Sequence, residues 1–497
     1  MDDARPEPTG IPIRTILLGV AGVTLIAFGG TGAGAILKRD PLLADTSLSW
    51  LRYGHGHDLA TAVLYLGLGL VIWAWVRLGR MVRNHHVGSI AVVIAVAAWA
   101  LPLLFAPPLF SKDIYSYLAQ GQLALHGFDP YLVGPAALPS PLSDNVSWVW
   151  QNTPAPYGPL FVLLAKAIVA ATNASVIGGV VAMRLTLASG LVLVCWALPG
   201  LARHLGGRSA TALWLGAANP LVLVHLIGGA HNDVLMIGLM AAGVLMVLER
   251  RHVLGIALVT LAFAVKATAV VALPFLVLVW AARLDGTRRN RLGKAIGGSV
   301  AVFVAVFATC TVVAGVGLGW IPALRTSSTI VNWLSLPSAV GDFVYTLVNS
   351  VVRVGPGVFM TIARGLGSVL LIYIAWRQWR AASEELDHRG GTAADGSAAI
   401  RRAAITMLAL ALLSPATLPW YFSWPLVLGA GFAWTTSMLT ATTFASVGLL
   451  LVTFPNGDTA LYSWGYLVLT ALVSALAAIS LTRPDPLELS SRYGPRP

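Results

Sequence analysis

Long apolar runs constrain the fold of this chain more than any other sequence feature. A helix needs about 20 mostly apolar residues to cross a bilayer. Runs of that kind cover residues 13–37, 59–76, 87–106, 178–200, 210–228, 233–249, 267–282, 295–317, 357–377, 402–416, 436–454 and 462–481. The pattern predicts an all-α fold, a polytopic transmembrane helical bundle.

The composition agrees with that prediction and excludes an ordinary soluble domain. Only 10% of the 497 residues are charged, whereas soluble proteins carry about 25%. The net charge of +12 would suggest nucleic acid in a soluble protein. Here the Lys and Arg residues are expected to be cytoplasmic anchors of the helices, so we expect membrane lipids and no nucleic acid as partners.

Basic loops predict the orientation of the helices, because short cytoplasmic loops collect Lys and Arg. All basic loops lie inside if 253–265 and 421–434 cross the bilayer while 158–172 and 338–352 do not fully cross. We therefore expect about fourteen spans with both termini in the cytoplasm. Short re-entrant or interfacial helices would lie on the outer face.

We treat residues 1–497 as a single integral membrane domain. Its expected parts are a catalytic module at 87–285 and a C-terminal helical module at 286–481. The polar, Gly-rich stretch 383–398 is expected to be a cytoplasmic linker. The Pro-rich region 107–157 is a long outer loop, and functional loops are over-represented at such lengths. We expect it to carry catalysis on short helices along the outer membrane surface.

Asp113 is the first candidate for chemistry, in the segment FSKDIYSYLAQGQLALHGFDPY. A helix over 113–126 places Asp113, Tyr117 and Gln120 on one face. An outer carboxylate there can act as a general base that deprotonates a hydroxyl. The alternative is that Asp113 only stabilises the helix through its macrodipole.

Two other residues of the outer loop have a structural and a functional interpretation. Asp129 precedes Pro130 in GFDPY, a turn sequence, and it either forms the turn or binds a sugar. Tyr157 in TPAPYGPLF either stacks on a sugar or anchors the chain at the interface. The sequence leaves both choices open.

The segment GGAHNDVLM places His231, Asn232 and Asp233 at the start of a span. Asp233 could cap its helix, but three adjacent polar residues exceed what capping needs, so we expect them to bind substrate. Lys266 lies between two apolar runs on the outer side. It either snorkels or holds a phosphate by its point charge.

A metal ion is not expected, because one His and one Asp are too few ligands, and Cys195 and Cys310 have no metal-ligand spacing. In SPATLPWYFSWPL, Pro415 and Pro419 break a helix near the outer face. The aromatic residues that follow, Trp420 and Tyr421, either belong to the interfacial belt or line a groove for a lipid tail.

The ordered set of segments SKDIYSYLAQGQLALHGFDPY, NTPAPYGPLF, GGAHNDVLM, FAVKAT and SPATLPWYFSWPL resembles the actinobacterial polyprenol-phosphate-mannose-dependent α-1,6-mannosyltransferases. These enzymes belong to the GT-C superfamily of integral membrane glycosyltransferases. The resemblance covers about residues 60 to 481 and implies a GT-C-like bundle. It implies polyprenyl-phosphate-mannose as donor, a mannosylated phosphatidylinositol glycolipid as acceptor, a lipomannan product and no cofactor.

The resemblance also implies site roles. An acidic residue in an early outer loop is the base in GT-C enzymes, and Asp113 has that place. Many relatives have paired acidic residues, whereas this chain has Lys112-Asp113, and its loop follows the third span instead of the first. A β-linked donor that gives an α linkage implies inversion by one displacement. Lys266 and His231 would then stabilise the leaving phosphate.

Two other functions compete with this interpretation. One is a polytopic transporter or lipid flippase, which should bury polar residues at mid-membrane in repeated, broken helices. Here the polar segments gather at one interface. The other is a GT-C transferase for a different lipid-linked sugar, such as glucose or arabinose. In the preferred interpretation the protein is a multi-pass plasma membrane enzyme with its active site on the periplasmic face.

Overall fold

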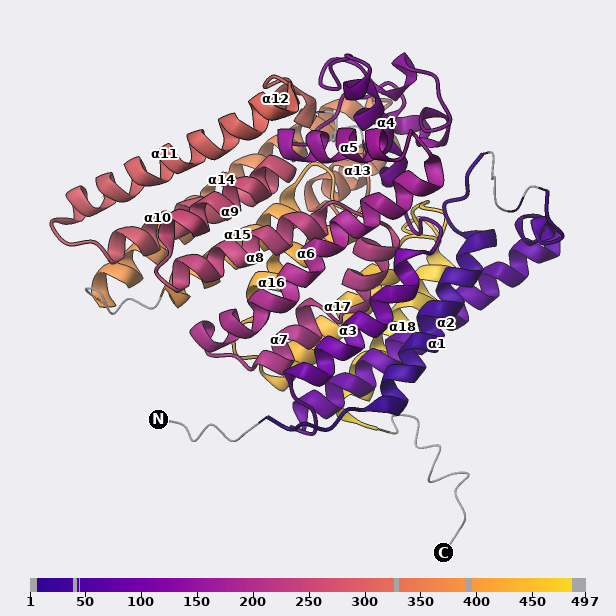
Figure 1. The fold of residues 1–497 in the computed structure, drawn as a ribbon, viewed down its shortest axis with the longest axis horizontal. Helices are drawn as coiled ribbons and strands as arrows, with labels where there is room; N and C mark the ends of the chain where they lie inside the picture. Colours follow the sequence, from indigo (N-terminus) through magenta and orange to yellow (C-terminus); the bar gives the residue numbers. More distant parts are fainter. Residues whose placement is uncertain (1–6, 39–42, 44, 326–329, 390–395, 485–497) are drawn as a thin grey trace, which may run out of the picture. The chain divides into compact units, whose positions relative to one another are not determined.

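The computed structural model describes residues 7–38, 43, 45–325, 330–389 and 396–484. These described residues form helices and no named strand, with two isolated β-bridges (Figure 1). They divide into two compact units that do not follow chain order. The modules expected at 87–285 and 286–481 do not coincide with these units, and their separate functional roles stay a prediction.

Unit 1 combines residues 1–112, 206–229 and 432–497. In its core the rings of Trp75 and Trp214 stack at 4.9 Å, and each indole N–H donates to the other residue's carbonyl oxygen. Its helices are α1 (Ile13–Ala33), η1 (Ser49–Arg52), α2 (Gly54–Arg83), α3 (Ser89–Leu104), α7 (Ser209–Gly216), the π-helix η5 (Leu221–Gly228), α17 (Thr436–Leu451) and α18 (Trp464–Thr482).

Unit 2 combines residues 113–205 and 230–431. Its longer helices are α4 (Asp113–Leu125), α5 (Pro159–Ala171), α6 (Val176–Leu205), α8 (Asp233–Leu248), α9 (His252–Val265), α10 (Leu273–Ala282), α11 (Arg288–Ala314), α13 (Leu336–Asn349), α14 (Pro356–Arg389), α15 (Ser397–Leu413) and α16 (Ser423–Ala430). Short helices connect them: η2 (Pro135–Ala137), η3 (Ser143–Asn145), η4 (Trp148–Trp150), η6 (Ala267–Ala272), α12 (Trp320–Ala323) and η8 (Pro419–Phe422).

The helices confirm an all-α polytopic membrane protein. Among the described residues, six helices are long and apolar enough to cross a membrane: α1, α2, α6, α11, α14 and α18. The pair α7 and η5, bent by 49°, can form one more crossing. The ambiguous segments 158–172 and 338–352 became α5 and α13, with 13 and 14 residues, which is short for a 30 Å core. The total of about fourteen spans stays a prediction.

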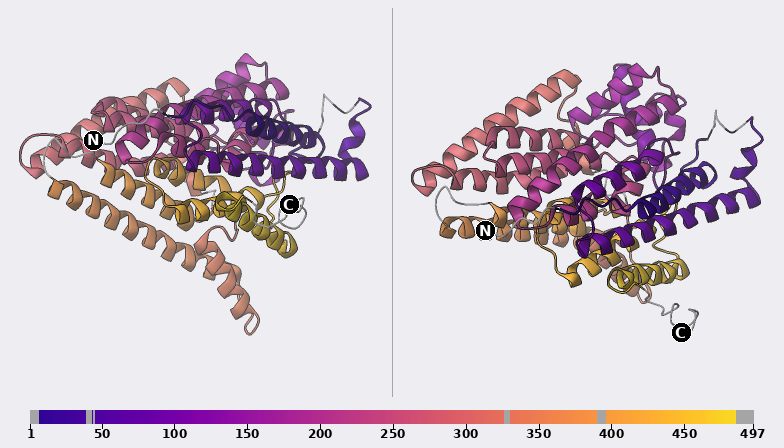
Figure 2. Two further views of the ribbon diagram at one scale, coloured as in Figure 1. Left: turned by 90° about the horizontal axis from the view of Figure 1, so that it is seen from below. Right: turned by 60° about the horizontal axis from the view of Figure 1, so that its bottom comes forward.

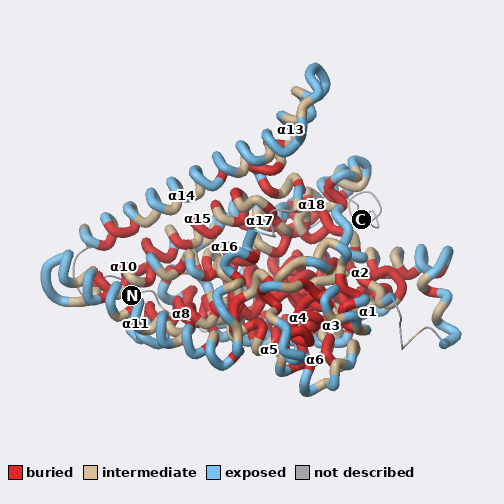
Figure 3. Tube along the Cα trace, turned by 90° about the horizontal axis from the view of Figure 1, so that it is seen from above, coloured by how far each residue is buried: buried red, intermediate tan, exposed pale blue. Residues whose placement is uncertain are grey.

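Exposed apolar faces mark where unit 2 would meet lipid. Few residues of α13 and α14 are buried, whereas α4 is almost entirely buried (Figure 3). Figure 2 shows that α13 folds back along the start of α14.

Helix α14 continues to Arg389, so it includes the first part of the expected linker 383–398. Residues 390–395 of that linker lie outside the described residues.

Close backbone contacts through glycine bring the site-bearing segments of unit 2 together. A Cβ atom on Gly238 of α8 would lie 2.3 Å from the carbonyl oxygen of Gly190 of α6. A Cβ atom on Gly158, before α5, would lie equally close to that of Ala264 at the end of α9. The Gly158 N–H also donates to the Val265 carbonyl oxygen at 3.2 Å. Small residues permit such contacts between membrane helices. The contact of Gly158 with Ala264 and Val265 holds the neighbouring residues Tyr157 and Lys266 close together.

Candidate functional site

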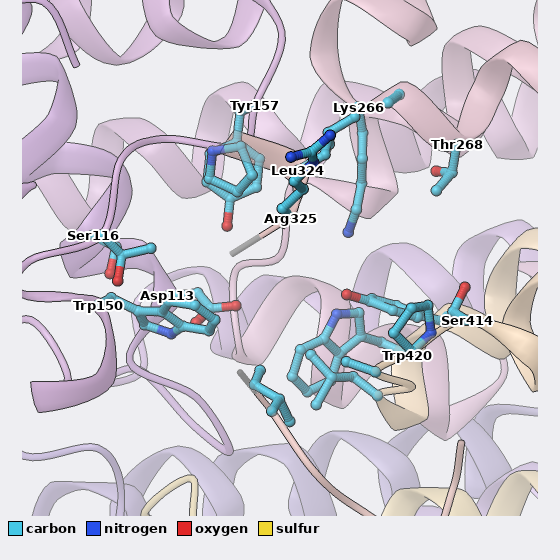
Figure 4. Close-up of a pocket in the computed structure, with 18 of the residues that line it drawn as sticks. Asp113, Ser116, Trp150, Tyr157, Lys266, Thr268, Leu324, Arg325, Ser414 and Trp420 are labelled. Atoms are coloured by element: carbon cyan, nitrogen blue, oxygen red, sulfur yellow. The ribbon is translucent and has the colours of Figure 1, made fainter. Parts of the chain in front are cut away.

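One large pocket lies within unit 2 and has a volume of about 700 Å³ (Figure 4). Its wall comes from α4, the segment 150–157, η6, the end of α12 and the helix break between α15 and α16. The charged lining residues are Asp113, Lys266 and Arg325. Most of the remaining wall is apolar or aromatic, which is the usual make-up of a ligand pocket.

Helix α4 presents one face to this pocket. Asp113, Ser116, Tyr117 and Gln120 all line it, and they follow the helical spacing i, i+3, i+4 and i+7. The predicted helix over 113–126 is confirmed as Asp113–Leu125. The side chain of Asp113 keeps 18% of its surface exposed, so a substrate can reach its carboxylate.

Lys266 is held by a buried carboxylate. Helix α9 ends at Val265, and Lys266 has the extended backbone of a C-cap before η6. Its ammonium group donates to both carboxylate oxygens of Asp233 at 2.8 Å. The indole N–H of Trp424 donates to the same carboxylate at 2.6 Å. Asp233 is therefore more than a helix cap, and it compensates the charge of Lys266.

Aromatic rings complete the setting of Lys266. Its ammonium group lies 4.7 Å from the centre of the Tyr421 ring and 5.4 Å from that of Trp424. The two rings stack on each other at 4.4 Å. Cation–π attraction of this kind contributes on the order of 0.5–2 kcal/mol.

The predicted break at Pro415 and Pro419 is confirmed, because α15 ends at Leu413 and η8 begins at Pro419.

His231 lies beside the carboxylate of α4. Its Nε2 is 3.7 Å from Oδ2 of Asp113, and its ring stacks on Trp420 at 3.7 Å. The imidazole is fully buried. The preceding residue, Ala230, has a left-handed φ of 55°, a conformation that costs roughly 1–2 kcal/mol outside glycine. This strained turn directs residues 231–233 into the interior of unit 2.

Two tyrosines, Tyr117 and Tyr157, also line the pocket. The rings of Tyr117 and Tyr157 meet edge to face at 5.1 Å, and Phe161 packs against both. Burial raises the pKa of Tyr117 well above its usual value, and the neighbouring Tyr157 and Asp113 raise it further. The Tyr117 hydroxyl therefore stays protonated and can donate a hydrogen bond.

The structure brings together most of the residues that the sequence proposed as the catalytic base or as substrate ligands. Asp113, Tyr117, Gln120, Tyr157, Lys266, Trp420 and Tyr421 line the pocket. His231 and Asp233 lie directly behind it through their contacts with Asp113 and Lys266. Asn232 is fully buried between them, and among the described residues its side-chain amide has no hydrogen-bond partner.

Asp129 stands apart from this group. It is not among the residues that line the pocket. Its carboxylate accepts from the backbone N–H of Tyr131 at 2.9 Å, which is the turn role that the sequence left open.

Ser116 and Thr268 have no signal in the sequence that singles them out as ligands. Besides Lys266, the basic residues outside the expected cytoplasmic loops include Arg184, Arg325, Arg353 and Arg364. The sequence does not rank them. Ser116, Thr268 and Arg325 all line the pocket (Figure 4). Ser116 follows Asp113 by one helical turn, and this spacing indicates only a shared helix face. In the part of the chain that the structure describes, no three His, Cys, Asp or Glu residues group as metal ligands.

The helices and the pocket together describe a polytopic membrane enzyme. The sequence model of a family described as "Alpha-(1->6)-mannopyranosyltransferase, N-terminal domain" matches residues 16–282. A second model, "MptB C-terminal domain", matches residues 337–483. The chain belongs to the alpha-(1->6)-mannopyranosyltransferase family, and it is a mannosyltransferase.

Two curated relatives show the extent of this similarity. Alpha-(1->6)-mannopyranosyltransferase A of Mycobacterium tuberculosis is 42% identical over 464 residues, which cover 92% of this chain and 87% of the relative. Alpha-(1->6)-mannopyranosyltransferase A of Corynebacterium glutamicum is 33% identical, over 92% of this chain and 96% of the relative. No solved structure matches the chain significantly.

Proposed function

We propose that this enzyme transfers mannose from polyprenyl-phosphate-mannose to a mannosylated phosphatidylinositol lipid. The new bond is an α-1,6 linkage of the lipomannan backbone, and the reaction takes place at the outer face of the plasma membrane. One observation supports the proposal most strongly: an accessible carboxylate and a lysine face the same 700 Å³ pocket. The relatives' names support the linkage.

The chemistry is a single inverting displacement. The acceptor hydroxyl gives its proton to the Asp113 carboxylate while its oxygen bonds to the anomeric carbon. The bond from that carbon to the phosphate oxygen breaks, and the polyprenyl phosphate leaves with the electron pair. Positive groups aimed at the departing oxygen stabilise its growing charge. No covalent sugar–enzyme intermediate is formed in this scheme.

Lys266 and Arg325 are the positive residues that line the pocket. Lys266 is held in place by its ion pair with Asp233. The leaving phosphate gains one negative charge in the reaction, and Arg325 supplies positive charge for it. Arginine binds phosphate with two parallel donors, which suits this role.

Arg325→Gln is therefore expected to raise the KM for the lipid-linked donor about tenfold or more, equivalent to the loss of roughly 1.5–3 kcal/mol from a charged hydrogen bond. Steady-state kinetics with donor as the varied substrate measures the change. Arg353→Gln is the matched control, because Arg353 is exposed and lies outside the pocket lining. Equal effects of the two variants would assign the change to general surface charge.

His231 is a positioning residue in this scheme, since its contact is with Asp113. His231→Gln is expected to lower kcat about tenfold or more, because misorienting a base disturbs the reacting geometry. The donor KM should change by less than about twofold. A variant with unchanged kcat and a raised donor KM would place the imidazole at the phosphate instead.

A radiolabelled assay tests the proposed function itself. Purified enzyme in lipid vesicles receives polyprenyl-phosphate-[³H]mannose and a mannosylated phosphatidylinositol acceptor. Labelled α-1,6-mannolipid is the expected product. Movement of labelled donor across the vesicle membrane without a glycosidic product would indicate a transporter or flippase. Transfer from a glucosyl or arabinosyl donor but not from the mannosyl donor would indicate another sugar.

A further inference from the structure

Ser116 is a buried hydroxyl that the proposed mechanism does not use. Its side chain is 3% exposed and lines the pocket. Among the described residues, its Oγ has no hydrogen-bond partner. Thr268, on the Lys266 side of the pocket, also has a buried hydroxyl without a described partner, but Ser116 is the more buried residue.

The unpartnered hydroxyl of Ser116 is unusual for a helical serine or threonine. Such residues commonly donate to the carbonyl oxygen of the preceding turn. Thr260 in α9 does so, with its hydroxyl 2.8 Å from the Ile256 oxygen. Ser116 has no such bond, and a buried polar group without a partner is unfavourable. An alanine at this position would avoid that cost, so folding alone does not explain the serine.

We propose that Ser116 determines sugar specificity by binding the 2-hydroxyl of the transferred mannosyl ring. This inference rests on the proposed function. In a reactive complex the acceptor oxygen lies about 3 Å from its base and about 3–3.5 Å from the anomeric carbon. Residues one helical turn apart have Cβ atoms about 5–6 Å apart. Ser116 therefore lies near the reacting carbon, and the 2-hydroxyl, on the adjacent ring carbon, is the ring hydroxyl nearest to it.

The chemistry of the two hydroxyls fits this pairing. Each hydroxyl can donate one hydrogen bond and accept others, so serine and sugar satisfy each other. A pocket with a buried polar group discriminates strongly against a ligand that leaves the group unpaired. The 2-hydroxyl is also the substituent whose configuration separates mannose from glucose.

The test compares two enzymes on two donors. Wild type and Ser116→Ala are assayed with polyprenyl-phosphate-linked mannose and 2-deoxymannose, and kcat/KM is measured for each pair. The substitution should lower kcat/KM about 10- to 100-fold on the mannosyl donor. On the 2-deoxy donor it should change kcat/KM by less than about twofold, because the bonded hydroxyl is already absent. Equal losses on both donors, or no loss on either, would overturn the proposal.

Two further variants keep the result interpretable. Thr260→Val removes a buried hydroxyl outside the pocket lining and should leave the preference for mannose over 2-deoxymannose unchanged. Ser116→Cys preserves the side-chain volume with a weaker hydrogen-bonding group, and it provides the same comparison if the alanine variant does not accumulate. Ser116→Cys should also reduce the ratio of kcat/KM for the mannosyl donor to that for the 2-deoxymannosyl donor. A ratio equal to that of wild type would count against the proposal.

The design separates this inference from the function on which it rests. If wild type transfers no mannose from polyprenyl phosphate, the proposed function fails. If wild type transfers mannose but Ser116→Ala affects both donors equally, only the role of Ser116 fails.

Discussion

Asp113→Asn is expected to reduce mannosyl transfer about 100- to 10,000-fold, the usual contribution of a general base. The amide keeps the size of the side chain but cannot accept the acceptor's proton at neutral pH. Donor binding should remain, because the positive residues of the pocket are unchanged. Single-turnover transfer from labelled donor, together with equilibrium donor binding, measures the two effects separately.

Asp144→Asn is the matched control for this substitution. Asp144 belongs to η3 in the same region, residues 107–157, is exposed and does not line the pocket. Its variant should retain transfer within about twofold, as expected for a surface substitution. Near-wild-type turnover by Asp113→Asn would remove this residue from the mechanism, whatever its place in the pocket.

The pair formed by Asp233 and Lys266 should show the largest effect on stability. Both side chains are shielded from solvent, with 1% and 15% of their surface exposed. Removing either partner leaves an uncompensated charge, which typically costs about 3–5 kcal/mol. Asp233→Leu and Lys266→Met should each lower the thermal midpoint of the detergent-solubilised enzyme, followed by tryptophan fluorescence.

The double variant Asp233→Leu/Lys266→Met distinguishes pairing from simple packing. Because it removes both charges together, it should be more stable than either single variant. Its affinity for the donor should nevertheless be lower than that of wild type, because Lys266 is absent from the pocket. If the thermal midpoint of the double variant falls by the sum of the two single decreases, the account of this pair is contradicted.

Periodicity and local chemistry in the sequence predicted much of the fold and several individual elements. Apolar runs predicted the helical membrane protein, and the spacing of Asp113, Tyr117 and Gln120 predicted the face of α4 that lines the pocket. Proline chemistry predicted the break between α15 and η8. These features depend on residues close together in the chain, so one sequence is enough to find them.

The pairing within the site could not be predicted in the same way. Asp233 and Lys266 are 33 residues apart and meet only because α8 and α9 pack together. The sequence instead proposed Asp233 as a substrate ligand and His231 as a partner of the phosphate. The observed contacts connect Asp233 to Lys266 and His231 to Asp113. Side-chain pairing across helices depends on rotation and depth, which the apolar pattern does not determine.

Ser116 and Arg325 illustrate two other limits of predicting site residues from the sequence. The spacing from Asp113 indicates that Ser116 shares its helix face. Because a serine on a helix commonly bonds to its own backbone, the spacing does not predict a side-chain hydroxyl without a partner there. Arg325 was one of several basic residues on the same side of the predicted bundle, and only the pocket distinguishes it. In both cases the decisive information is which side chains border a common cavity.

The central claim is that donor phosphate and catalytic base share one pocket, and a cryo-electron microscopy structure with a non-cleavable phosphonate analogue of the donor tests it directly. The measurement is the position of the phosphorus atom. We expect phosphonate oxygens within about 3 Å of Lys266 or Arg325 nitrogens, with the anomeric carbon facing Asp113. An analogue bound elsewhere, with the Asp113 carboxylate away from the sugar, would contradict the account.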